Sequence, residues 1–162
     1  MKRDEALKAA FPQAEEIEKI EIFLSDEQAA KIESISRSRL NSRLFIVYKG
    51  IKGDNTLGYA IIDTHTLRTK TETVMFVVNP DGTLSHAEIL AFFEPPEYMP
   101  GDNWIELFNG KSAKDSIRLG KDIPNITGAT ITSNSLAQTM RQILAIVRVS
   151  LLQGNIVKKE PK

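Results

Sequence analysis

Short apolar runs separated by turn-forming residues dominate the stretch 43–94, and they restrict the fold more than any other feature. The runs are rich in the β-branched and aromatic residues that favour strands. They occupy residues 44–48, 57–62, 74–78 and 84–93. Two connections, Lys52–Asn55 and Asn79–Gly82, have the composition of tight turns. Strands joined by tight turns pair with their chain neighbours, so the pattern predicts a meandering antiparallel sheet.

Two short helices around a strand are predicted before this region. Pro12 should end a first helix near Phe11, because proline has no N–H to donate and disfavours helix in the residue before it. Apolar residues at partly alternating positions in 17–24 predict a strand. The capping-box pattern of residues 25–28 then predicts a second helix that runs to about Ser36.

The C-terminal third is predicted to end in a long helix. One apolar stripe at helical spacing contains Leu136, Met140, Ile143, Val147 and Leu151. Gly154 is the expected C-terminal stop of this helix. Before it, residues 94–121 are predicted to be irregular, apart from a short helix that Asp102 or Asn103 caps and that ends at Phe108.

These elements predict an α+β fold, an antiparallel sheet packed against helices in one structural domain. We expect residues 1–40 to form a helical and extended segment that packs on the core. Residues 41–155 are expected to form the main domain, and residues 156–162 a frayed tail.

The composition excludes several classes of protein. The chain has 162 residues, with 21 basic and 21 acidic side chains, so the basic excess of a nucleic-acid binder is absent. There is no cysteine, which excludes disulfides, thiol catalysis and thiolate-held metal centres. With two histidines, a multi-histidine metal site is not expected. No catalytic residue is predicted, and any chemistry is expected to come from a cofactor.

No segment has the pattern of a membrane span or a leader. Carboxylates follow the basic start of the chain and no apolar stretch comes next, so we expect no secretory signal peptide here. No window of about 18 apolar residues is present, and none is expected to span a bilayer. A leader or anchor lost by truncation would leave no trace in this sequence.

The most informative motif, Thr127–Ser133, opens the predicted last helix. The first turn of a helix presents unpaired N–H groups and therefore attracts anions. Gly128 and Ala129 leave space for a bulky group near the backbone. Four hydroxyl groups could hydrogen-bond a phosphate or carry one covalently: those of Thr127, Thr130, Thr132 and Ser133. The alternative interpretation is a Thr or Ser N-cap after a tight turn.

This motif resembles the [Ser/Thr]-Gly-Ala-Thr-x-[Thr/Ser] signature of the FMN-binding domain family. The family includes one component of the sodium-translocating NADH:quinone oxidoreductase and one component of the Rnf electron-transport complex. The resemblance implies that Thr130 carries FMN through a phosphoester bond, which a separate flavin transferase makes from FAD. It also implies that Gly128 and Ala129 allow close approach. The phosphate would be held by the helix N–H groups with Thr127, Thr132 and Ser133.

Two further blocks occur in the order typical of this family, and the match in order extends over residues 56–150. Glu94–Met99 follows the hairpin 74–93, in the place where family members have Glu-Thr-Pro-Gly-Leu-Gly. Trp104–Lys111 resembles the family's short helix that ends in Phe-x-Gly-Lys. The resemblance implies that the first block borders the isoalloxazine ring, with Glu94, Pro95 and Tyr98 as the contacting residues.

The chain departs from the family pattern at two places. Pro124 stands where an aspartate usually precedes the motif by three residues, and the nearest carboxylate is that of Asp122. Glu97 and Met99 replace the glycines of the family's Pro-Gly-Leu-Gly block. A transferase that reads the aspartate would therefore attach flavin inefficiently, or a variant enzyme would be used.

Two other features have a functional and a structural interpretation. The loop residues Arg68, Thr69 and Lys70 could offset the phosphate charge or border the ribityl chain, or they could form a solvated connection. His65 lies near Asp63 in sequence and could hold a proton near a flavin. We interpret it as a residue of a polar turn without a special role.

The predicted function is electron transfer through FMN tethered to Thr130. We expect a redox carrier or a subunit of an oxidoreductase system in preference to a stand-alone enzyme. Its expected location is extracytoplasmic or membrane-associated. Its partners would be a flavin transferase and a membrane or extracytoplasmic electron-transfer protein. Two alternatives stay open: a module that binds FMN without a covalent bond, for binding or sensing, and a flavin-free interaction domain on the same scaffold.

Overall fold

The computed structural model describes residues 2–67 and 69–152 of the chain. Its centre is a five-stranded antiparallel sheet in which the strands follow chain order. The strands are β1 (Glu16–Phe23), β2 (Leu44–Lys52), β3 (Asn55–Thr66), β4 (Thr71–Val78) and β5 (Leu84–Phe92). The predicted α+β fold with a meandering sheet is therefore confirmed.

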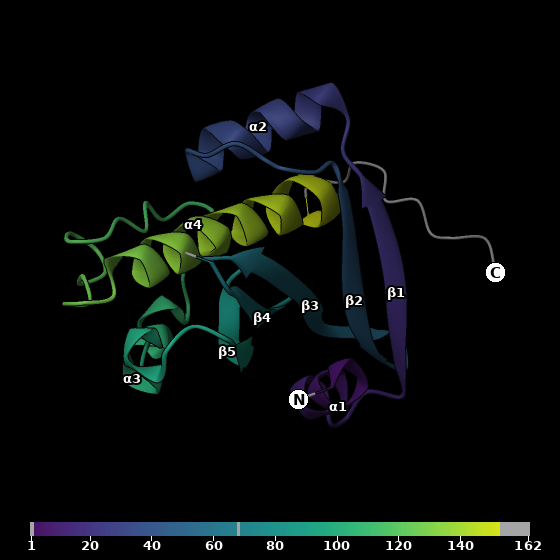
Figure 1. Ribbon diagram of the computed structural model, residues 1–162. Coiled ribbons are helices and arrows are strands. Elements are labelled where there is room, and N and C mark those ends of the chain that lie inside the picture. The colour runs from purple at the N-terminus through teal and green to yellow at the C-terminus, as the bar shows by residue number, and fades with distance from the viewer. Residues whose placement is uncertain (1, 68, 153–162) are drawn as a thin grey trace.

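Helices cover both faces of this sheet (Figure 1). The long helix α4 crosses one face and α2 packs on α4, while α1 lies against the opposite face. The helices are α1 (Arg3–Ala10), α2 (Asp26–Ser36), α3 (Asp102–Ile105) and α4 (Thr130–Val147). Short 3-10 turns occupy Pro96–Tyr98 and Glu106–Phe108, and a π-helical turn, Arg148–Leu152, continues α4. In the described residues, no helix is both long enough and apolar enough for a transmembrane span.

The strand β4 has a core on each side, which explains its continuous apolar sequence. Val74 and Phe76 face the larger core beneath α4. Met75 and Val77 face a second core formed with α1, where Phe11 is 6% exposed. Alternate residues of a strand point to opposite faces, so both layers of helices are held by the same strand.

Local sequence signals place the helix ends largely as expected. Ser25 Oγ accepts a hydrogen bond from the Gln28 N–H at 3.0 Å, and Gln28 Oε1 accepts one from the Ser25 N–H at 3.0 Å. This capping box opens α2, as predicted. The first helix ends at Ala10, directly before Phe11 and Pro12.

Three boundaries differ from the sequence predictions or lie outside the described residues. The strand β3 begins at Asn55 and ends at Thr66, and is longer than predicted because it pairs with β4 as far as the turn. The cap of α3 is Gly101 and not Asp102 or Asn103, because the carbonyl of Gly101 accepts the first hydrogen bonds of that helix. The predicted stop at Gly154 lies outside the described residues.

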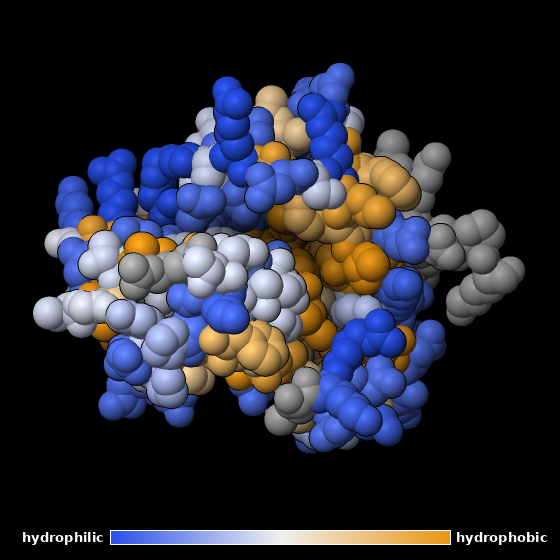
Figure 2. Space-filling model, in the orientation of Figure 1, coloured by the Kyte–Doolittle hydropathy of each residue, from blue (hydrophilic) through white to orange (hydrophobic). Residues whose placement is uncertain are grey.

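The surface reflects the same layers. Figure 2 shows hydrophilic side chains projecting at the α2 end of the molecule and hydrophobic atoms in the hollow below them. The exposed apolar side chains include Phe23 of β1 and Leu44 of β2, which are 66% and 44% exposed. These two residues are register partners at the end of the β1–β2 pair.

We predict that the substitution Gly50→Ala destabilises the fold. A Cβ atom at Gly50 would lie 2.6 Å from Cγ of Phe11, whose ring packs on the β2 backbone. Such overpacking costs about 1–3 kcal/mol of the free energy of unfolding. The free energy of unfolding in urea measures it. The matched control is Gly101→Ala, where a Cβ atom meets nothing within 4 Å. There we expect a change below about 1 kcal/mol, from the weaker preference of alanine for the N-cap of α3. Equal stabilities of the two variants would show that Phe11 yields without cost.

Candidate functional site

The first turn of α4 has no side-chain cap. Its N-cap is Ala129, with no side-chain hydrogen bond, and the first turn contains no acidic residue. Gly128, directly before it, has a φ of +82°, and a Cβ atom there would meet nothing within 4 Å. The interpretation of the motif as a Thr or Ser N-cap is therefore wrong. The helix start presents free N–H groups beside an open stretch of backbone.

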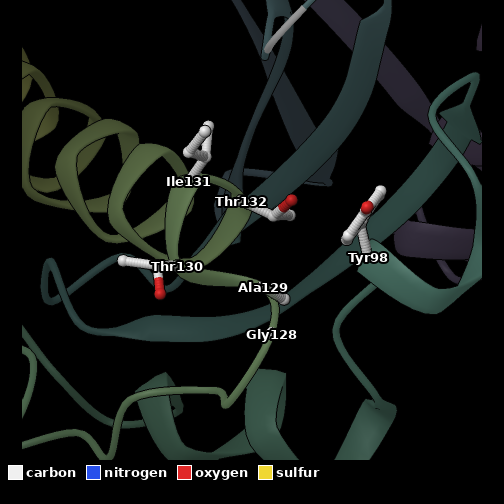
Figure 3. Close-up of a pocket in the computed structure, with 6 residues that line it drawn as sticks. All are labelled: Tyr98, Gly128, Ala129, Thr130, Ile131 and Thr132. Carbon is white, nitrogen blue, oxygen red and sulfur yellow. The ribbon is translucent and has the colours of Figure 1, made fainter.

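A cavity of about 230 Å³ lies at this helix start, lined by Tyr98 and the residues 128–132 (Figure 3). Thr132 is buried and extends from the first turn toward Tyr98, whereas Thr130 is exposed and extends to the other side of the turn. Ile131, 49% exposed, points away from both threonines. Two threonines therefore line one small cavity, and their side chains extend to different sides of the turn.

A second, larger cavity of about 660 Å³ shares one lining residue, Tyr98, with the first. It is lined by Thr69, Lys70, Phe93, Glu94, Pro95, Pro96 and Tyr98. Glu94 is 7% exposed, and its Oε1 accepts hydrogen bonds from the Lys70 N–H at 3.2 Å and from Thr69 Oγ1 at 3.4 Å. The carboxylate thus fastens the β3–β4 loop to the proline-rich loop. Arg68 of the same loop lies outside the described residues.

The structure brings together most of the residues predicted from the sequence, in two groups. Gly128, Ala129, Thr130 and Thr132 line the small cavity, and Thr69, Lys70, Glu94 and Pro95 line the large one, with Tyr98 in both. Two predicted residues line neither cavity. Thr127 is exposed before the turn, and Ser133 is fully buried, with its hydroxyl donating to the Thr130 carbonyl at 3.1 Å.

The segment before the motif is held by an indole. Trp104 Nε1 donates a hydrogen bond to the Pro124 carbonyl at 2.7 Å, and the Trp104 ring packs edge-on against buried Phe108, with centroids 5.1 Å apart. The neighbouring carboxylate of Asp122 accepts hydrogen bonds from the Ser116 hydroxyl and the Arg118 N–H, which lower its pKa. Asp122 is thus occupied in its own turn and does not replace an aspartate at 124.

A charged cluster that the sequence analysis missed lies on β3 and β4. His65 stands between two carboxylates: Nδ1 is 2.7 Å from Asp63 Oδ2, and Nε2 is 2.7 Å from Glu72 Oε2. His65 is the register partner of Glu72, and Asp63 points to the same face two residues earlier. The Glu72 side chain is fully buried, and the side chain of His65 is 18% exposed. His65 therefore belongs to a strand and not to a polar turn, which corrects our interpretation.

The geometry of the cluster defines its charge. The carboxylate of Asp63 accepts a hydrogen bond from Nδ1, and the negative charge of Glu72 beside Nε2 favours the cationic ring, which carries a proton on each nitrogen. The His65–Glu72 contact is an ion pair without hydrogen-bond alignment, and neither oxygen of Glu72 has a hydrogen-bond donor among the described residues. Burial lowers the pKa of His65, but the hydrogen bond to Asp63 and the charge of Glu72 outweigh it and raise that pKa to about 9.

The signal for this cluster was present in the sequence but weak. Asp63 and His65 are two residues apart, which on a strand places them on one face. Glu72 joins them only through the register of the β3–β4 hairpin, which depends on the length of the turn between the strands. The cluster could be predicted only if the strand β3 were extended past His65, so that His65 pairs with Glu72.

Comparison with known proteins agrees with this geometry. The model of the FMN-binding domain family matches residues 69–145. Among solved structures, the chain is similar to NqrC from Shewanella oneidensis, with a TM-score of 0.55 and 15% identity over 83% of this chain and 80% of that one. A search of curated protein sequences finds no significant match. The resemblance to FMN-binding domains is thereby confirmed, and it indicates FMN as the cofactor.

We predict that the His65 cluster makes the stability of the fold depend on pH. The pKa of His65 rises from 6.5 to about 9 on folding, so the folded state binds the proton more tightly. The resulting stabilisation is complete below about pH 6.5 and is lost as the pH rises through about 9.

Urea unfolding of the chain and of His65→Gln at several pH values measures this dependence. The difference in the free energy of unfolding between the two proteins should be largest near pH 6 and shrink toward pH 10. The control variant His86→Gln, on the opposite face of the sheet, should keep the original profile. A difference that does not change with pH would contradict the prediction.

Proposed function

We propose that this chain, whose residues 69–145 match the FMN-binding domain family, is a redox carrier that holds FMN by a phosphoester bond to Thr130. The observation that supports this most directly is the position of Thr130. It is an exposed hydroxyl at the first residue of α4, beside an uncapped helix start and a cavity. When bound, FMN supplies reversible one- and two-electron chemistry, while the protein supplies attachment, orientation and electrostatics.

The chemistry around Thr130 fits a phosphate. Free N–H groups in the first turn of a helix and the positive end of its dipole stabilise an anion. No acidic side chain lies in this turn to repel one, and Gly128 leaves the backbone accessible. Thr132 offers a further hydroxyl on the cavity side. In the proposed site, these groups orient the phosphate, and Ser133 supports the turn from inside through the Thr130 carbonyl.

The space beyond the phosphate fits a ring of the size of a flavin. Tyr98 lines both cavities, and their volumes of about 230 and 660 Å³ together are in the usual range of cofactor pockets, about 300–1,000 Å³. Rigid walls suit a planar ring, because a pre-organised wall loses little entropy on binding. Pro95 and Pro96 stiffen one wall, and Glu94 ties it to Lys70 in the other. We propose that Tyr98, Glu94 and Lys70 border the ring and the ribityl chain.

The proposed attachment needs a donor and an enzyme. The Thr130 Oγ–phosphorus bond forms at the flavin-side phosphorus of FAD as the pyrophosphate P–O bond breaks, and AMP leaves. The hydroxyl proton passes to a base of the flavin transferase, and no atom is oxidised or reduced. Because Thr130 is exposed, its hydroxyl is accessible to such an enzyme. The carrier would then exchange electrons with a membrane-associated or extracytoplasmic protein.

The alternative function is a module that holds FMN without the covalent bond. The observation that favours it is Pro124, which stands where family members carry an aspartate, since Asp122 is engaged in its own turn. A flavin-free interaction domain is the second alternative. In that case the cavities at Tyr98 would not hold FMN. Titration of the purified chain with FMN would then show no binding.

We predict that Thr130→Val abolishes covalent attachment while the fold remains. Valine has nearly the shape of threonine but no hydroxyl, and the side chain is exposed, so the free energy of unfolding should change by less than about 0.5 kcal/mol. Flavin fluorescence in a denaturing gel after co-expression with a flavin transferase measures attachment. The control is Ser34→Ala, which removes an exposed hydroxyl of α2 outside the motif and should leave attachment intact.

Attachment that persists in Thr130→Val would contradict the proposed site. A parent chain that binds FMN in solution but loses it in the gel would favour the non-covalent module. No binding in either assay would favour the flavin-free domain.

We predict that Pro124→Asp increases the yield of attachment if the transferase reads an aspartate at this position. Trp104 donates to the carbonyl of Pro124 and not to its side chain, so the substitution keeps that hydrogen bond. The flavin-to-protein ratio by absorbance measures the yield, and Asn125→Asp is the control for added charge. An unchanged ratio in Pro124→Asp would show that the proline is tolerated.

A further inference from the structure

The Asp63–His65–Glu72 cluster adjoins the wall of the larger cavity through the sheet. Glu72 is the register partner of Phe92, the residue before Phe93, which lines the cavity. The Phe93 N–H donates to the Thr71 carbonyl at 3.1 Å, so the cavity wall begins one residue from Glu72. Along the strands, Glu72 therefore lies one residue from the segment that lines the cavity that we assign to the flavin ring.

The cluster carries one uncompensated negative charge: two carboxylates face one imidazolium. Its most buried member, Glu72, has no hydrogen-bond donor among the described residues and relies on His65 alone. Screening by water is weak at such a site, so the net charge acts over a longer distance than it would at the surface.

Few other charges compete with the cluster. In the described part of the adjoining elements, the titratable groups nearest the cavity are Lys70, Glu94 and Tyr98, with the exposed Glu97 in the same loop. Tyr59 lies farther back on β3 and Arg141 farther along α4, and β5 carries His86 and Glu88 on the opposite face of the sheet. The helix α4 has no charged residue from Thr130 to Met140, and Phe92 of β5 is uncharged. A change of charge in the cavity is therefore felt mainly by the cluster and by Lys70 and Glu94.

We propose that the Asp63–His65–Glu72 cluster is a proton-coupled electrostatic element of the flavin site. In this proposal, electrons added to the bound flavin strengthen the hold of the cluster on the His65 proton. Loss of that proton, in turn, disfavours reduction of the flavin. The inference rests on the proposed function, because it requires FMN in the cavity.

The effect of reduction on the His65 proton and the effect of that proton on reduction have the same coupling free energy. Reduction adds negative charge beside His65 and favours its protonated form. By linkage, the deprotonated cluster, with one more negative charge, opposes reduction by the same amount. At neutral pH the imidazolium is present and keeps Glu72 paired. We expect the coupling to appear as the pH approaches about 9, where His65 titrates.

The titration of His65 in the FMN-loaded chain, followed by NMR, tests the proposal. The chain contains two histidines, so a protein without a histidine tag gives two C2–H resonances. His86 lies on the opposite face of the sheet and is the internal control. Dithionite supplies the electrons for reduction and is oxidised to sulfite, while protons come from the solvent. We expect the His65 midpoint to move to higher pH by about one unit on reduction, and the His86 curve to stay unchanged.

Variants of the two carboxylates separate this coupling from a purely structural role. In oxidised Glu72→Gln, the His65 midpoint should fall by about one pH unit or more, because one negative partner is lost. The break in the flavin midpoint potential against pH, expected near pH 9 in the parent chain, should move to lower pH with it. Glu88→Gln, on the opposite face, should leave both unchanged. If Glu72→Gln does not fold, Asp63→Asn, at the more exposed carboxylate, tests the same shift.

Each outcome decides one question. A His65 midpoint that is equal in the oxidised and reduced forms overturns the coupling and leaves the proposed function intact, since FMN is then demonstrably bound. A break in the potential that stays at the same pH in both carboxylate variants also overturns it. A chain that binds no FMN overturns the proposed function, and the coupling with it.

Discussion

The packing of α4 on the sheet is the interaction on which the rest of the structure depends. Its apolar stripe, from Leu136 to Val147, is almost fully buried against the sheet and α2, with 0% exposure at Leu136 and Met140. Burial of this size outweighs any local preference of the first turn, so the helix begins at Thr130 without a capping side chain. The uncapped start is therefore stabilised by the helix behind it, and it stays available for an anion.

A second set of contacts brings the two walls of the site together. Trp104 fastens the segment before the motif through the Pro124 carbonyl, and Glu94 fastens the β3–β4 loop to the proline-rich loop. Each contact joins two residues that are far apart in sequence, and at least one residue of each pair lies outside regular secondary structure. Loops held in this way can present side chains to a ligand with little further ordering. Tyr98, between the two cavities, is positioned by this arrangement.

The extent to which the sequence predicts this molecule follows from the range of the interactions. Strands joined by tight turns, the capping box at Ser25 and the stripe of α4 are local, and the structure confirms them. The N-cap at Ala129 and the cap at Gly101 were missed, because packing and not side-chain preference decides where those helices begin. The cluster with Glu72 was missed because it depends on hairpin register, which one residue more in the turn would change.

The charges of the protein differ between the two ends of the site and favour one orientation of a flavin nucleotide. At one end, the start of α4 has free N–H groups and no acidic residue, which favours the phosphate of a flavin nucleotide. At the other end, the carboxylate of Glu94 lines the cavity and that of Glu72 lies on β4 opposite Phe92, the residue before the lining segment. His65 and Lys70 are the cations at this end. A phosphate in the second position would face two carboxylates, whereas a ring that is neutral when oxidised would not. The carboxylates at this end disfavour a phosphate there and so favour one orientation of the ligand. In that orientation the flavin ring, which gains charge on reduction, lies at the same end as these carboxylates and His65.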